Sequence, residues 1–153
     1  MKYLAFFAPF ALGAVALPRS QTSTTQAKIN GFDAHTKAGG NGASISYNLQ
    51  IDGQVDTHCH YADETSGTKL PAVDRIPCDD ESVSWQMRQD PSQPGTEGRY
   101  RILIFLHDTN SATGKVDVGF HEWLAKDFVK EIVGSQSETV YKGVPDFTVT
   151  LSS

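Results

Sequence analysis

Residues 44–62 read SISYNLQIDGQVDTHCHYA, two alternating segments on either side of Asp52-Gly53. In each segment every second residue suits a buried position, which is the period of a strand with one face on a core. Asp-Gly between two such segments is a strong signal for a β-hairpin. The residues predicted to face the core are Ile45, Tyr47, Leu49 and Ile51 in the first strand and Val55, Thr57, Cys59 and Tyr61 in the second.

The rest of the chain continues this β pattern. Further strands are predicted around Ile29 and Phe32, over 83–88, over 100–107, over 116–120 and over 147–151. The segment from Tyr100 to His107 is almost wholly apolar, so we expect a central strand that is covered on both faces. The sequence therefore predicts an all-β fold, a compact antiparallel β-barrel or sandwich.

One stretch has a different period. Large apolar residues from Phe120 to Ile132 recur at helical spacing, and Gly134 suits a helix C-cap. Glu122, four residues before Lys126, adds a helical ion pair. Taken alone, the pattern fits a short helix near 122–133 as well as it fits strands, and taken with its surroundings it fits two strands; both alternatives stay open.

The N-terminus carries the marks of a secretion signal. Lys2 precedes an apolar run over 3–15, and Ala14-Val15-Ala16 is a small-x-small cleavage site. We expect a signal peptide over 1–16, a flexible polar leader over 17–26 and one domain over 27–153. The predicted location is therefore extracellular, and no second long apolar run predicts a membrane span.

Cys59 and Cys78 are the chain's only cysteines. An even number of cysteines in an exported chain predicts a disulfide rather than a metal site. Closing a loop of this size stabilises the fold by about 3 kcal/mol in the chain-entropy model.

The charge of the chain argues against two classes of partner. The formal net charge is −5 at pH 7. Acidic domains with scattered basic residues are poor candidates for binding nucleic acid or anionic membranes. We therefore expect neither partner.

His58 and His60 are weak candidates for a transition-metal site. They flank Cys59 and share the opposite face of the predicted strand, and a pair of imidazoles suits copper or zinc. A third ligand is not fixed by sequence; His35, His107 and Asp56 are available. The run Asp79-Asp80-Glu81 is a weak calcium candidate without EF-hand spacing. Exposed strand histidines are common without a metal, so no cofactor is expected.

No catalytic motif is evident. The serine motif Gly-x-Ser-x-Gly is not completed at residues 42–46, and adjacent His107 and Asp108 point apart on a strand. We therefore expect a protein that is not an enzyme. The five aromatic residues that could line a ligand cavity are instead expected to fill the interior: Trp85, Tyr100, Phe105, Phe120 and Trp123.

Two long polar loops, over 63–74 and 90–99, are the predicted recognition surface, because binding residues concentrate on loops held by rigid strands. The candidate partner-binding residues are Asp63, Glu64, Thr65, Lys69, Arg75, Gln93, Glu97 and Arg99.

From about Ile29 to Leu151 the chain resembles the secreted fungal allergen β-barrel family, the Alternaria-allergen-like domain. The pieces that carry the resemblance are INGF over 29–32, SISYN over 44–48, Cys59, Cys78 followed by Ser84-Trp85, and GVPDFTVTL over 143–151. The resemblance implies a secreted effector or elicitor that a host perceives. It also implies an extracellular plant partner such as a thaumatin-like defence protein, or a small phenolic ligand.

The chain departs from the family in its cysteines. Tyr141 stands where many members have a cysteine of a second disulfide, and the early cysteine that links two chains is absent. A monomer and a non-covalent dimer both remain open. The predicted function is host-protein binding that triggers or suppresses immunity; the alternative is a small secreted hydrolase or a carrier of metal or a small ligand.

Overall fold

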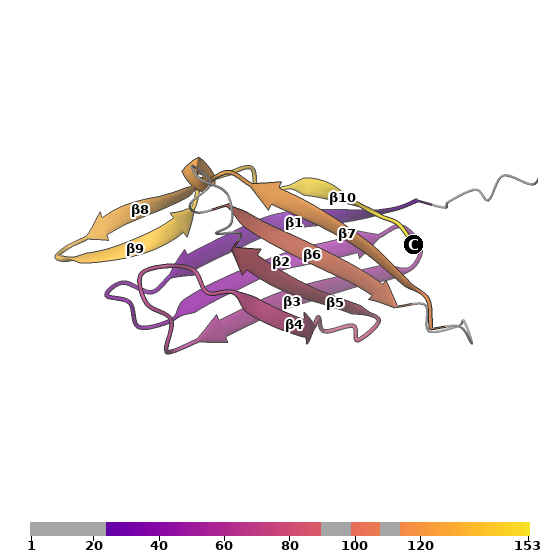
Figure 1. Ribbon diagram of the computed structural model, residues 1–153, viewed down its shortest axis with the longest axis horizontal. Coiled ribbons are helices and arrows are strands. Elements are labelled where there is room, and N and C mark those ends of the chain that lie inside the picture. The colour runs from indigo at the N-terminus through magenta and orange to yellow at the C-terminus, as the bar shows by residue number, and fades with distance from the viewer. Residues whose placement is uncertain (1–23, 90–98, 108–113) are drawn as a thin grey trace, which may run out of the picture.

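The computed structural model describes residues 24–89, 99–107 and 114–153. These residues form two antiparallel sheets that pack face to face over one hydrophobic core (Figure 1). The first sheet has the strand order β3 (Val55–Asp63), β2 (Ala43–Ile51), β1 (Thr25–Thr36), β9 (Gln136–Tyr141) and β8 (Phe128–Val133), and β10 (Phe147–Leu151) also pairs with β1. The second has the order β4 (Val73–Pro77), β5 (Val83–Gln89), β6 (Tyr100–His107) and β7 (Val116–Trp123).

The predicted all-β class is confirmed. The two sheets are not closed into a barrel, so the sandwich is the architecture that the described residues adopt. The predicted signal peptide over 1–16 and most of the leader lie outside the described residues. The end of the leader is strand instead, because Thr25 and Gln26 in β1 pair with Leu151 and Thr150 in β10.

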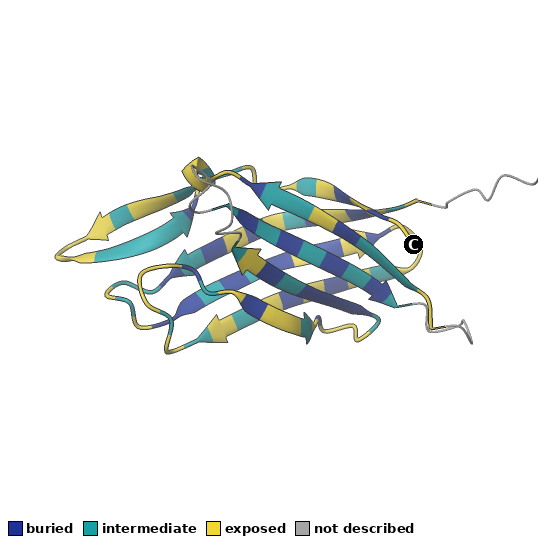
Figure 2. Ribbon diagram, viewed as in Figure 1, coloured by how far each residue is buried: buried dark blue, intermediate teal, exposed yellow. Residues whose placement is uncertain are grey.

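The hairpin at Asp52-Gly53 is also confirmed. β2 and β3 pair without a break from Ala43↔Asp63 to Ile51↔Val55, and Gly53 takes the positive φ of 72° that the turn requires. The alternation of buried and exposed residues along both strands matches the prediction (Figure 2).

Strand β10 links the two sheets along one side of the sandwich. It pairs with β1, and just beyond its end Ser152 exchanges two backbone hydrogen bonds with Val118 of β7, at 2.9 and 3.1 Å. Gly119 of β7 allows this approach, because a Cβ there would lie 2.4 Å from the Thr150 carbonyl oxygen.

A disulfide joins the sheets along the other side. Cys59 lies in β3 and Cys78 directly follows β4, and these are the outer strands of their sheets. The two Cα atoms are 4.3 Å apart. The predicted pairing of the cysteines is therefore confirmed.

Of the two alternatives left open over 122–133, a short helix or two strands, the structure has the strands. Strand β7 continues to Trp123, a single 3₁₀ turn (η1, Ala125–Asp127) follows, and the chain then forms β8. Pairing across strands outweighs the helical period: Trp123 lies opposite Tyr100, and β8 pairs with β9 along its whole length. Gly134, with φ 65°, makes the β8–β9 turn instead of ending a helix.

Strand β6 is central, but it is not covered on both faces as predicted. Its buried residues alternate with half-exposed ones, so that Leu103 and Phe105 lie on the outer face of the sheet. Of the five aromatic residues expected to fill the interior, Trp85, Tyr100 and Trp123 do so, whereas Phe105 and Phe120 do not.

Candidate functional site

The outer face of the second sheet carries an apolar patch. Phe105 and Leu103 of β6 lie opposite Val118 and Phe120 of β7, on the side away from the buried residues of both strands. Phe120 is 61% exposed. Leu103, Phe105 and Val118 beside it are half-buried. An exposed apolar patch that spans neighbouring strands can mark a site of interaction.

Arginines surround these aromatic rings. All four arginines of the residues that the structure describes lie on this face: Arg75 of β4, Arg88 of β5, Arg99 directly before β6, and Arg101 of β6. We call this surface, with Leu103, Phe105, Val118 and Phe120, the aromatic–arginine face. It concentrates positive charge in a chain whose net charge is −5.

Arg75 is held against Phe105. Its guanidinium carbon lies 3.9 Å from the ring centroid, and its Nε donates to Ser84 Oγ at 2.8 Å. Its Nη2 lies 2.7 Å from His107 Nε2, which must accept because arginine has only donors. Burial and the nearby Arg75 charge lower the pKa of His107, in keeping with a neutral ring.

Arg101 is held in the same way beside Phe120. Its guanidinium carbon is 5.0 Å from that ring, and its Nη2 donates to Glu122 Oε2 at 2.7 Å. Arg99 donates to the other oxygen of Glu122 at 3.0 Å. The hydrogen bond from Arg101 is the main cause that lowers the pKa of Glu122. One carboxylate therefore orients two arginines.

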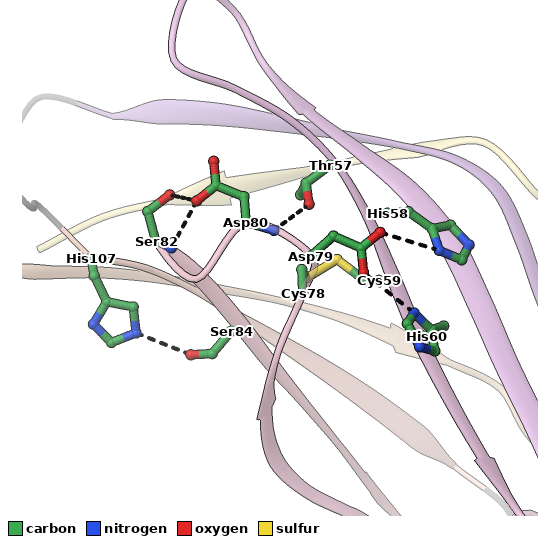
Figure 3. Close-up of a disulfide and its surroundings, with 10 residues drawn as sticks. All are labelled: Thr57, His58, Cys59, His60, Cys78, Asp79, Asp80, Ser82, Ser84 and His107. Atoms are coloured by element: carbon green, nitrogen blue, oxygen red, sulfur yellow. Dashed lines mark hydrogen bonds and ion pairs between the residues drawn. A yellow bond between two sulfur atoms is a disulfide. The ribbon is translucent and has the colours of Figure 1, made fainter.

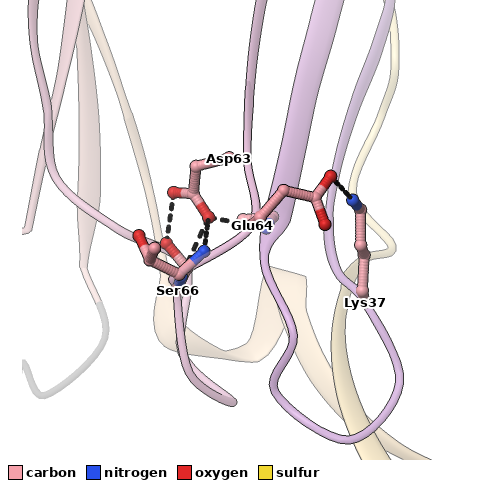
Figure 4. A network of polar contacts seen from close by, with 6 residues as sticks. Lys37, Asp63, Glu64 and Ser66 are labelled. Atoms are coloured by element: carbon pink, nitrogen blue, oxygen red, sulfur yellow. Dashed lines mark hydrogen bonds and ion pairs between the residues drawn. The ribbon is translucent and has the colours of Figure 1, made fainter.

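The predicted recognition loop after β3 is organised by its own carboxylate. Asp63 accepts hydrogen bonds from the Ser66 hydroxyl at 2.5 Å (Figure 4). It also accepts from the Thr65 and Ser66 amides and from the Tyr61 hydroxyl, the last at 2.6 Å. These bonds hold the pKa of Asp63 well below its usual range, and the bond from the Ser66 hydroxyl has the largest effect. In turn, the hydrogen bond to Asp63 raises the pKa of Tyr61 to about 12.

The other predicted partner-binding residues fall in different places. Glu64 forms an ion pair with Lys37, and Lys69 is exposed. Arg75 and Arg99 belong to the aromatic–arginine face. Gln93 and Glu97 lie outside the described residues. The sequence-based prediction did not include the aromatic–arginine face as a binding surface. The sequence signal for this face is that Phe105 and Phe120 stand at outward positions of strands that carry or adjoin arginine.

Ser84 and His107 form the contact nearest to a catalytic pair. Ser84 Oγ lies 3.1 Å from His107 Nε2. A base must accept the proton of its nucleophile at that nitrogen, but Nε2 already accepts from Arg75. The arrangement therefore suits a fixed polar network better than an activated serine.

The weak metal candidates His58 and His60 lie on the outer face of β3, with the disulfide on its inner face (Figure 3). Asp79 lies beside both rings, and the ligand atoms of the three residues are within 4.8 Å of one another. The expected third ligands are not the ones brought there: His35 bonds to Asp33 at 2.8 Å, and His107 faces Arg75.

Comparisons with known proteins give no identification. No protein-family model matches the chain, and no curated protein matches it. The resemblance to the Alternaria-allergen-like family therefore stays a prediction. Among the residues that the structure describes, none belongs to a helix that is both long and apolar enough to cross a bilayer.

Proposed function

We propose that this protein is an exported binding module that recognises another protein through its aromatic–arginine face and catalyses no reaction. The observation that carries the proposal is that all four arginines of the described residues share one sheet face with two outward phenylalanines, and that Arg75 and Arg101 lie against these rings. Aromatic residues and arginine are enriched at the energetic centres of protein interfaces.

The face is prepared for binding before a partner arrives. Arg75 is fixed by Phe105, Ser84 and His107, and Arg101 by Phe120 and Glu122. Ordering a long side chain on binding costs roughly 0.5–1.5 kcal/mol. Contacts that already restrict these arginines reduce this cost and leave their remaining N–H groups available for a partner.

The charge of the face indicates the chemistry of the partner. An arginine-rich face with an apolar centre fits a surface that offers carboxylates around apolar side chains. The predicted signal peptide and the disulfide support an encounter outside the cell. On the resemblance, we expect the partner to be a plant extracellular defence protein of the thaumatin-like class and the role to be that of an effector or elicitor.

The test is a binding measurement with matched surface variants. Purified protein, Phe120→Ser and Arg75→Ala would be titrated against a purified thaumatin-like protein. Val144→Ser is the control, since Val144 is 71% exposed and lies in the β9–β10 connection, off this face. We expect each face variant to lower the affinity by at least about tenfold, or ~1.4 kcal/mol, and the control to bind like wild type.

Infiltration of the same proteins into leaf tissue tests the biological role. A response to wild type and to Val144→Ser, but not to Phe120→Ser, would agree with the proposal. Face variants that bind and act like wild type would overturn the assignment of the face. A wild-type protein that neither binds this partner nor elicits a response would overturn the proposed role.

A further inference from the structure

We propose that His58, His60 and Asp79 form a binding site for one divalent transition-metal ion, Cu²⁺ or Zn²⁺. The site lies on β3 and on the turn after β4, and it shares no residue with the aromatic–arginine face. The inference therefore goes beyond the proposed binding function and does not depend on it.

The imidazole rings of His58 and His60 both face the carboxylate of Asp79. His60 Nδ1 lies 3.7 Å from Asp79 Oδ1, and His58 Nδ1 lies 4.0 Å from Oδ2 (Figure 3). The rings stack nearly parallel, with 18° between their planes and 5.3 Å between their centroids. Both rings thus present the same nitrogen to the space in front of Asp79.

These distances suit an intervening ion better than direct contact. A His–carboxylate hydrogen bond is about 2.7–3.0 Å long, as the His35–Asp33 pair of this chain shows at 2.8 Å. At His58 and His60 the gaps are longer, although both nitrogens face the carboxylate. Ligands about 2.0–2.2 Å from a tetrahedral ion lie roughly 3.3–3.6 Å from one another, so only small side-chain rotations are needed.

The backbone already holds the three residues together. The disulfide fixes Cys59, between the two histidines, to Cys78, next to Asp79. The Asp79 amide donates to the His58 carbonyl at 2.9 Å, and the Asp80 amide donates to Thr57 Oγ1 at 2.8 Å. An ion would therefore need to order only side-chain torsions, which favours binding.

The donor set selects the class of metal. Two imidazoles and one carboxylate suit zinc and copper, whereas calcium and magnesium prefer sites made only of oxygen. The side chains are 45%, 61% and 60% exposed for His58, His60 and Asp79, so an ion can enter and water can complete its coordination. Copper should bind more tightly than zinc to the same ligands.

Isothermal titration of the purified secreted protein with CuCl₂, and separately with ZnSO₄, tests the site. We expect one ion per chain for wild type. His58→Ala, His60→Ala and Asp79→Asn should each weaken binding by at least about tenfold, since even outer-shell ligand partners are worth that much. His35→Ala is the matched control: it breaks another His–Asp pair of the same chain and should bind metal like wild type.

Electron paramagnetic resonance gives a second readout on the unaltered chain. Cu²⁺ bound at the site should show coupling to two imidazole nitrogens, and only one in His58→Ala. Circular dichroism and intact mass would verify that each variant folds with its disulfide formed. Absence of saturable one-to-one binding by wild type would overturn the proposal, as would metal binding that His58→Ala and His60→Ala leave unchanged.

Discussion

Replacement of the disulfide by the double substitution Cys59→Ala/Cys78→Ala should destabilise the protein by about 3 kcal/mol. The two cysteines are 19 residues apart in the sequence, and opening a loop of this length returns that much conformational entropy to the unfolded chain. Both side chains are buried, so the small cavities left by the sulfur atoms act in the same direction. The backbone bond from Asp79 to His58 remains and offsets little.

Urea unfolding followed by tryptophan fluorescence measures this loss. Trp85 and Trp123 are both buried in the core, so their emission reports exposure on unfolding. With a urea dependence of about 1–3 kcal/mol per M, the midpoint should fall by roughly 1–3 M. Reduced wild type should lose slightly less stability than the double variant, because it keeps both sulfur atoms, and reductant should not change the variant.

Two results would refute this reasoning. One is a loss of less than about 1 kcal/mol, which would mean that the unfolded chain gains little freedom when the bridge is removed. The other is a mass measurement that finds both thiols free in protein recovered from a secreting host. The second result would also count against the predicted export.

Three other substitutions test separate features of the fold. Gly119→Ala should destabilise the protein by about 1–3 kcal/mol in chemical unfolding, because the added Cβ would meet β10. Gly67→Ala is the control, since a Cβ there meets nothing within 4 Å and should cost little. Equal effects of the two variants would contradict the close approach of β7 and β10. Tyr47→Phe should leave stability unchanged or raise it, because the buried Tyr47 hydroxyl has no hydrogen-bond partner within the described part of the chain; a clear loss of stability would show that it has one. Asp63→Asn should bring the Tyr61 pKa down from about 12 toward 10 in an ultraviolet titration, and a pKa that stays near 12 would contradict the assigned cause.

The Asp63 carboxylate also gives a pH dependence with a definite sign. Its pKa is lower in the folded protein than the ordinary value of 3.8. A group whose pKa is lowered by folding stabilises the protein at pH values above its unfolded pKa. This stabilisation is lost as the pH falls through the folded pKa. The stability gap between wild type and Asp63→Asn should therefore be full at neutral pH and shrink below about pH 4.

Local patterns could be read from the sequence, and patterns that depend on distant pairing could not. The β2–β3 hairpin follows from a period of two and an Asp-Gly turn, both contained in residues 44–62. The stretch over 122–133 stays open between a short helix and two strands because its apolar residues follow the helical period. Its strand pairing, of β7 with β6 and of β8 with β9, is not visible in that period, and a short isolated helix does not outweigh those hydrogen bonds.

The metal candidate shows the same limit. Alternation predicts that His58 and His60 share one face, but it does not identify the third ligand among His35, His107 and Asp56. In the sequence Asp79 stands out only as part of an acidic run. A usable signal was present: Asp79 follows Cys78, whose bonded partner Cys59 stands between the two histidines. Residues that adjoin two bonded cysteines in the sequence therefore lie close together in the fold.

The two proposed sites depend differently on this bridge. The Phe120 side of the aromatic–arginine face is built within one sheet, since β6 and β7 pair continuously and Glu122 holds Arg101 across them. The His58–His60–Asp79 site spans both sheets, and the Cys59–Cys78 bridge adds to the two hydrogen bonds that tie its third ligand to the first two. Loss of the bridge in a chain that remains folded should therefore weaken metal binding while it spares recognition through Phe120. The Cys59→Ala/Cys78→Ala variant separates the two sites: equal loss of both activities would mean that they share a structural basis that the sheet pairing does not explain.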